Sequence, residues 1–173
     1  HVRSRRQRQM CIRDRDNAFT SRDYTGYFQQ LHKSELALAM KLEADRMRNL
    51  ILTKEEFAKE IKVVMEERRL RTDDQPHALV YEKMMSVAYQ SHPYRRPIIG
   101  WMNDLENMSV DDAQEWYDRW YAPNNAVLVV VGDVDPKEVY SLAQKYYGEI
   151  KSRPIDSLAC LLYTSDAADD SLR

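Results

Sequence analysis

The sequence predicts an α+β fold in which an antiparallel sheet has helices packed on one face. Three observations support this prediction: two short extended pieces near the N-terminus, a long middle region with helical periodicity, and an apolar run at residues 125–131. The expected order of elements is strand, strand, four helices, strand and helix. The 173 residues are enough for one domain with a core.

The first half of the expected domain follows from turn and capping residues. Residues 16–28 predict two extended pieces around a polar turn at Ser21-Arg22-Asp23, because Thr, Tyr and Phe favour strands. Helical periodicity then runs from about Gln29 to Leu50. A second helix is expected from Lys54 to Thr72, and Thr53 is its predicted N-cap.

Two further helices are expected between the charged middle and the apolar run. The third follows Pro76 and reaches about Ser91, and its inward positions are predicted to be Val80, Met84 and Val87. The fourth begins at Ser109, because Asp112 lies three residues later and completes a pattern typical of a capping box.

The last strand and helix are predicted from the segment that follows. The continuous apolar run at residues 125–131 indicates a strand that is buried on both faces. Asp135 and Pro136 then give an N-cap followed by a proline at the first helical position. We expect this helix to continue to Tyr147 and to end at Gly148.

Composition and charge narrow the range of functions. The 26 basic and 28 acidic residues give a net charge of −2, which offers no electrostatic reason to bind nucleic acid or an anionic membrane. The longest apolar run, Ala126 to Val131, is far shorter than the ~20 residues of a membrane-spanning helix. Because the chain opens at His1 rather than Met, we expect its natural N-terminus to be missing, and the compartment stays open between cytoplasm, bacterial periplasm and organelle.

The two ends differ from the middle of the chain. Residues 1–15 are rich in arginine, residues 160–173 show no periodicity, and MCIRDR and CLLYTSDAADD resemble translated sequencing-adapter ends. We expect residues 1–15 and 154–173 to be non-native sequence or disordered ends. The domain itself is expected to occupy residues 16–153.

Two glutamates in the second expected helix are candidates for chemistry. Glu60 and Glu67 are seven residues apart, so they lie two helical turns apart on one face, beside an apolar stripe. Carboxylates at the edge of a core need a partner or a cation, and a zinc ion with its histidines would provide one. Helices rich in charge also carry such residues on a solvated face, so spacing alone leaves both interpretations open.

Other catalytic patterns are missing from the sequence. No two of the four histidines have the spacing of a helical zinc pair, and His32-Lys33-Ser34-Glu35 continues with Leu36 where H-x-x-E-H needs histidine. No serine lies in a G-x-S-x-G elbow, and there is no glycine-rich phosphate loop.

Five segments in order resemble the pitrilysin/insulinase family of zinc metallopeptidases. They are NAFTSRDYT (17–25), LEADRMRNL (42–50), EIKVVMEERR (60–69), HPYRRPIIG (92–100) and YAPNNAVLVVVGD (121–133). The resemblance implies an inverted zincin, in which two histidines of H-x-x-E-H and a distant glutamate hold zinc while the glutamate of that motif is the general base.

The resemblance assigns roles to residues of this chain. Glu67 matches the distal zinc ligand, Glu60 matches an acidic position that orients a ligand histidine, and Glu66 is a rival ligand about 100° around the helix. Asn17, Ala18, Phe19 and Thr20 match an edge strand that pairs with extended substrate, which implies a peptide or unfolded polypeptide as partner. The family also implies a C-terminal homologous domain or a partner subunit.

The sequence departs from the family at the most important point, because it has no H-x-x-E-H. We therefore expect a fragment of the N-terminal catalytic domain that does not bind zinc tightly or hydrolyse peptides by itself. Two alternatives stay open: a piece of a non-catalytic partner or scaffold subunit of the same fold, and an unrelated α+β binding domain.

Overall fold

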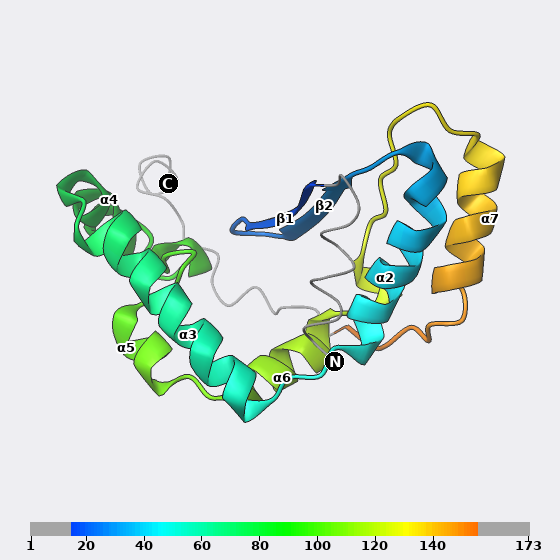
Figure 1. Ribbon diagram of the computed structural model, residues 1–173. Coiled ribbons are helices and arrows are strands. Elements are labelled where there is room, and N and C mark those ends of the chain that lie inside the picture. Colours follow the sequence, from blue (N-terminus) through cyan, green and yellow to red (C-terminus); the bar gives the residue numbers. More distant parts are fainter. Residues whose placement is uncertain (1–14, 156–173) are drawn as a thin grey trace, which may run out of the picture. The chain divides into compact units, whose positions relative to one another are not determined.

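The computed structural model describes residues 15–155 of the chain, and these residues form two compact units (Figure 1). The first unit contains the described residues up to Leu52 together with Ala113–Ile155, and the second contains Thr53–Asp112. The expected non-native ends, residues 1–15 and 154–173, fall almost wholly outside the described residues.

The structure combines helices with a two-stranded antiparallel sheet, which confirms the predicted α+β class. The strands are β1 (Arg15–Thr20) and β2 (Thr25–Gln30). The α-helices are α2 (Leu36–Asn49), α3 (Lys54–Arg68), α4 (Pro76–Ala88), α5 (Met102–Asn107), α6 (Val110–Trp120) and α7 (Pro136–Tyr147). Short turns of other helix types are η1 (Lys33–Glu35), η2 (Arg69–Asp73), η3 (Pro93–Arg95) and η4 (Pro123–Asn125).

The strands form a hairpin around the predicted polar turn. Asn17 lies opposite Phe28 and Thr20 opposite Thr25, and the amide of Ser21 donates to the carbonyl of Tyr24 at 2.8 Å to close the turn. The hairpin is therefore confirmed as the sequence predicted it.

Helix α2 packs on one face of β2. Tyr27 and Gln29 are two residues apart and so point to the same face of the strand. The Gln29 amide donates to Glu43 of α2 at 2.6 Å, and the Arg46 guanidinium lies 3.9 Å from the centre of the Tyr27 ring. Gln29 was predicted to begin a helix, and that boundary was wrong because strand pairing with Asp16 takes precedence over its helical preference.

Helices α2 and α7 lie side by side in the first unit (Figure 1). The buried apolar side chains of this unit are Met40 and Ala44 from α2, Tyr117 from α6, and Ala122. The start of α7 is confirmed, because the Asp135 carboxylate accepts from the amide of Lys137 at 2.8 Å. The described part of this unit therefore has a small core formed mainly by α2 and α6.

The predicted strand at residues 125–131 was wrong for the described structure. The segment is extended after η4, but no described strand pairs with it. Val127 and Val131 are 89% and 92% exposed, instead of being buried on both faces. A strand needs a neighbour that accepts and donates main-chain hydrogen bonds, and the described residues supply none here.

The predicted inward face of α4 was also wrong. Val80, Met84 and Val87 are all more than half exposed, and no described element covers them. The helix ends at Ala88, three residues before the predicted end at Ser91. Helical periodicity marks an apolar face, but it does not say what covers that face.

The second unit is organised around α3 and α5. Thr53 caps α3 as predicted, because its hydroxyl accepts from the amide of Glu56 at 3.2 Å. The short helix α5, which was not predicted, contacts α3 and contributes Leu105, which is 4% exposed. None of the described helices is long and apolar enough to cross a membrane.

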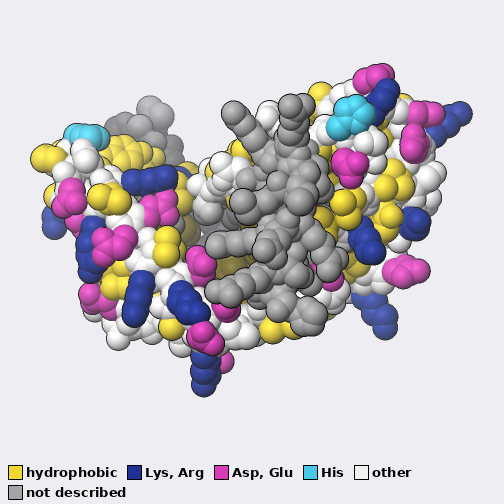
Figure 2. Space-filling view, viewed as in Figure 1, with side chains coloured by type: hydrophobic (Ala, Val, Ile, Leu, Met, Phe, Trp, Pro, Cys, Tyr) yellow, Lys and Arg dark blue, Asp and Glu magenta, His cyan; other side chains and the backbone are white. Residues whose placement is uncertain are grey.

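The visible surface carries mixed charge. Figure 2 shows acidic and basic side chains interspersed with hydrophobic ones on the face toward the viewer, rather than one basic or acidic patch. This distribution agrees with the balanced composition of the sequence.

Candidate metal-ligand helix and substrate strand

Helix α3 places the two predicted acidic residues on one face. Seven residues correspond to almost two full turns, so Glu60 and Glu67 lie about 10 Å apart along the helix axis and within about 20° of each other around it. Glu60 is exposed. The Glu67 side chain is 39% exposed and forms an ion pair with Arg71 at 2.6 Å. Of these two glutamates, Glu67 is therefore the one whose side chain is partly buried.

The neighbouring carboxylate of Glu66 has a different environment. Its side chain is 63% exposed and pairs with Arg69, which is also on the surface. Such a pair contributes little to stability because both groups stay in water. The difference in exposure makes Glu67 the better enclosed of the two adjacent carboxylates, in agreement with the spacing argument from the sequence.

Arg68, the next residue, anchors the end of α3. Its guanidinium makes two hydrogen bonds to the Glu82 carboxylate, at 2.9 and 3.0 Å, and a third to the carbonyl of Gly100 at 2.8 Å. The hydrogen bond to Glu82 raises the pKa of Arg68, so the guanidinium stays charged although the residue is 5% exposed. Burial of Arg68 was not predicted, because a basic residue in a charged helix usually lies on a solvated face.

Strand β1 carries the predicted substrate-binding residues. Asn17, Ala18, Phe19 and Thr20 are exposed, and β1 pairs only with β2 among the described strands. Its second edge therefore has no described partner, as strand addition requires. The Asn17 side chain accepts a hydrogen bond from the amide of Ala18 at 2.8 Å.

The Phe19 ring covers the strand opposite. It lies over Gly26, where an added Cβ atom would come within 2.5 Å of the ring. It also contacts the ring of Tyr24 edge to face, with centroids 5.6 Å apart. Glycine at position 26 thus lets the aromatic side chain of β1 lie flat against the hairpin.

The described residues offer no complete set of zinc ligands. Within residues 15–155 there is no group of three or more His, Cys, Asp or Glu that could hold a metal ion. Zinc sites in proteins need three or four protein ligands, so Glu67 fits as a single member of such a set. Glu60 and Glu67 belong to the second unit, and Asn17–Thr20 belong to the first.

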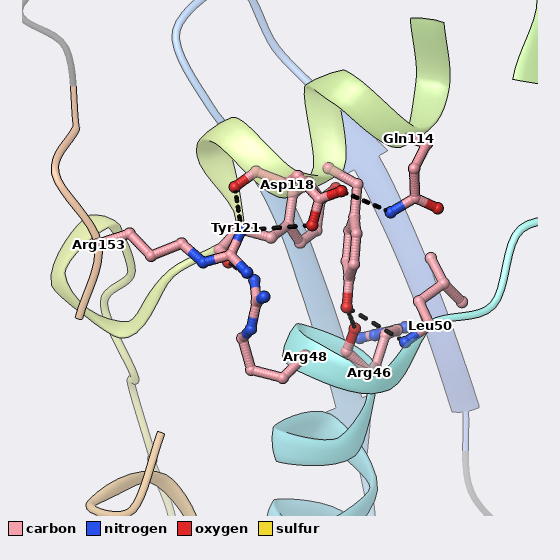
Figure 3. A network of polar contacts seen from close by, with 8 residues as sticks. Arg46, Arg48, Leu50, Gln114, Asp118, Tyr121 and Arg153 are labelled. Atoms are coloured by element: carbon pink, nitrogen blue, oxygen red, sulfur yellow. Dashed lines mark hydrogen bonds and ion pairs between the residues drawn. The ribbon is translucent and has the colours of Figure 1, made fainter. Parts of the chain in front are cut away.

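A polar network in the first unit joins the end of α2 to α6 (Figure 3). The Tyr117 hydroxyl donates to the carbonyl of Arg46 at 2.8 Å and accepts from the amide of Leu50 at 3.2 Å. Burial raises the pKa of Tyr117, which keeps its hydroxyl protonated. Arg48 donates to the carbonyl of Tyr121 at 2.9 Å.

The same network fixes the chain after α7. Arg153 donates to the carbonyl of Asp118 at 2.6 Å, and Gln114 donates to the carboxylate of Asp118 at 2.8 Å (Figure 3). The contact of Arg153 with Asp118 joins residues 35 positions apart, and no local pattern predicts it, whereas Gln114 and Asp118 are four residues apart within α6.

Two family models match the chain in succession. The model described as Insulinase (Peptidase family M16) matches residues 11–101, and the model described as Peptidase M16 inactive domain matches residues 107–168. The first match includes α3 with Glu60 and Glu67, as well as β1.

Curated relatives and solved structures agree with these matches. A protein named zinc protease PqqE from Helicobacter pylori is 38% identical over 79% of this chain and 31% of its own length. An uncharacterized zinc protease from Rickettsia felis is 30% identical over 78% of this chain and 32% of its length. The crystal structure of a protease from Helicobacter pylori superposes with a TM-score of 0.82 at 34% identity, covering 88% of this chain and 37% of that one.

A more distant structure shares the fold. The periplasmic protease PqqL from Escherichia coli has a TM-score of 0.78 at 23% identity, covering 92% of this chain and 18% of that chain. Judged by its coverage of the proteins from Helicobacter pylori and Rickettsia felis, the present chain spans about a third of the length of the curated relatives that it matches.

Proposed function

Because the chain belongs to the insulinase family, peptidase family M16, we propose that it is part of a zinc-dependent endopeptidase that cleaves peptides bound as an extended strand. The observation that carries the proposal is the pair Glu60 and Glu67 on one face of α3, within the segment matched by the family model. Residues 16–153 are then part of the catalytic half. Family membership excludes the unrelated binding domain.

In this proposal Glu67 is the zinc ligand supplied by this chain. Its partial enclosure on α3 and its spacing of seven residues from Glu60 support this choice over Glu66, whose side chain is 63% exposed. When bound, zinc polarises the scissile carbonyl and activates a water molecule. Glu60 orients a ligand histidine through a hydrogen bond, which keeps that ring in place.

The proposed substrate is a short peptide or an unfolded polypeptide. The edge of β1 at Asn17–Thr20 that has no described partner would pair with the main chain of the substrate, which requires an extended conformation but few particular side chains. A folded protein cannot offer such a strand without local unfolding. Substrate binding would thus depend on backbone access more than on sequence.

The remaining parts of the active site must come from outside this sequence. The two histidines and the general base of H-x-x-E-H are not in the chain, so this chain alone is expected to be inactive. The solved structures that it matches are two or more times as long, which supports a second homologous domain or a partner subunit in the complete protein.

The test uses the full-length protein that contains this chain. Glu67→Gln keeps the size of the side chain but removes the negative charge, so we expect loss of bound zinc and of turnover of an unstructured fluorogenic peptide. Glu66→Gln is the matched control and should retain both. Glu60→Gln should weaken zinc binding by about 10- to 100-fold, the usual effect of losing a group that orients a ligand.

Zinc content and turnover together distinguish the alternatives. Normal zinc content and turnover in Glu67→Gln, with loss in Glu66→Gln, would transfer the ligand role to Glu66. A wild-type protein that binds no zinc and cleaves no peptide would support the non-catalytic partner subunit of the same fold.

A further inference from the structure

Arg68 is the one buried charged side chain in the part of the chain that the structure describes. It joins three segments of the second unit: the last turn of α3, the middle of α4 through Glu82, and the loop before α5 through Gly100. Asp73 in η2 adds an ion pair at 3.4 Å. This set of contacts is a clamp on the end of α3.

The loop is shaped to meet the guanidinium. Gly100 has φ of +88°, a conformation that residues with a Cβ atom rarely adopt. The carbonyl of this residue accepts from Arg68 at 2.8 Å. The planar Arg68 guanidinium makes two hydrogen bonds to the Glu82 carboxylate. This pairing fixes the relative orientation of the two side chains more strictly than the flexible ammonium of a lysine would.

Stability alone is a weak reason to bury this group. Removing a charge from water is expensive, and well-packed apolar residues often replace a buried ion pair without loss. The Nε of Arg68 is buried and has no hydrogen-bond partner among the described residues. The hydrogen bonds that the guanidinium makes within the protein therefore do not replace all those that it would make with water. The clamp is better suited to holding one geometry than to adding stability.

The position of the clamp indicates what it holds. Glu67 is the penultimate residue of α3, and the helix changes to the π-helical turn η2 directly after Arg68. The ion pair of Glu67 with Arg71 adds little at this transition, because the Arg71 side chain is 76% exposed. Among the described side chains of this turn, Arg68 makes the buried contacts that fix its rotation against α4 and the loop before α5.

We propose that Arg68 is a positioning residue that, through Glu82 and the Gly100 carbonyl, sets the direction in which the Glu67 carboxylate faces the metal. This inference rests on the proposed function, because it presumes that Glu67 binds zinc. In this proposal Arg68 acts by fixing the backbone one residue away from Glu67, through its bonds to Glu82 and Gly100.

The test compares Arg68→Lys with Arg69→Lys in the full-length protein. Both changes keep the positive charge, but only the first removes a buried guanidinium with two bonds to one carboxylate. We expect Arg68→Lys to weaken zinc affinity, measured by chelator competition, by about 10- to 100-fold, with lower kcat and nearly unchanged KM. The visible absorption bands of the Co²⁺-loaded protein should shift in position or intensity. Arg69→Lys should stay within about twofold in zinc affinity.

A purely structural role gives a different result. If Arg68→Lys lowers the thermal midpoint of the metal-free protein but leaves zinc affinity and the Co²⁺ spectrum unchanged, the positioning role is wrong. If Arg68→Lys does not fold, Glu82→Asp is used instead, because it shortens the carboxylate side of the clamp. Zinc affinity and the Co²⁺ spectrum of that variant then test the positioning role in the same way. A wild-type protein without zinc refutes the proposed function itself, and a Glu67→Gln variant that retains zinc refutes the ligand role of Glu67; both results are independent of any change at Arg68.

Discussion

The Tyr117→Phe substitution removes one oxygen atom from the joint between α2 and α6. The hydroxyl bridges the carbonyl of Arg46 and the amide of Leu50, two groups that would bond to each other if α2 continued. The hydroxyl thus takes the place of the next helical hydrogen bond where α2 ends at Asn49. The phenylalanine ring fills the same space, so packing is preserved and the polar contribution is isolated.

The expected loss follows from the two hydrogen bonds. Each contributes about 0.5–1.5 kcal/mol net, so the free energy of unfolding should fall by about 1–3 kcal/mol. Tyr117 is 4% exposed, so water cannot easily replace the hydroxyl. If the loss is local, hydrogen exchange at the Leu50 amide should become about 5- to 150-fold faster.

Urea unfolding followed by circular dichroism measures the first quantity, and hydrogen exchange read by mass spectrometry measures the second. Tyr140→Phe is the matched control, because Tyr140 is 65% exposed and its hydroxyl accepts only from Gln144 at 3.4 Å. The control should shift the urea midpoint little. Equal shifts in both variants, or unchanged exchange at Leu50, would refute the bridging role of Tyr117.

Two more perturbations test local geometry. Gly100→Ala should lower the free energy of unfolding by about 1–2 kcal/mol, because alanine is strained at a φ of +88°; an unchanged urea midpoint would contradict this. Hydrogen bonds from Ser109 hold the pKa of Asp112 below its usual range. The Asp112 carboxylate therefore stabilises the start of α6 fully at pH values above its unfolded pKa of about 4. This stabilisation is lost as the pH falls through the lower pKa of the folded state. An NMR titration should show the Asp112 pKa rising toward its ordinary value in Ser109→Ala, and an identical midpoint in both proteins would refute the assignment.

Helix starts were predictable because their chemistry is local. Thr53, the pair Ser109 and Asp112, and Asp135 each bond to an amide two or three residues away, so the sequence contains both partners within one turn. The hairpin at residues 15–30 followed for the same reason, since the turn residues adjoin the strands they connect.

Predictions failed where the partner lies far away in the sequence or outside the described residues. The apolar run at residues 125–131 was assigned to a buried strand, but a strand is defined by its neighbour, and no described strand pairs with it. Val80 and Met84 form an apolar stripe on α4 that no described element covers. A continuous apolar run and a helical period identified these two segments correctly as apolar, yet neither pattern specifies the element that buries them.

The sequence by itself determined the α+β class, the hairpin, the capped helix starts and the spacing that puts Glu60 and Glu67 on one face of α3. These depend on contacts within a few residues, which the order of side chains specifies. Only the tertiary structure decided that Arg68, next to Glu67, is buried against Glu82 and the carbonyl of Gly100, 14 and 32 residues away. A charged residue chooses such partners only after α3 and α4 have packed, because desolvation by the surrounding chain is what makes those bonds preferable to water.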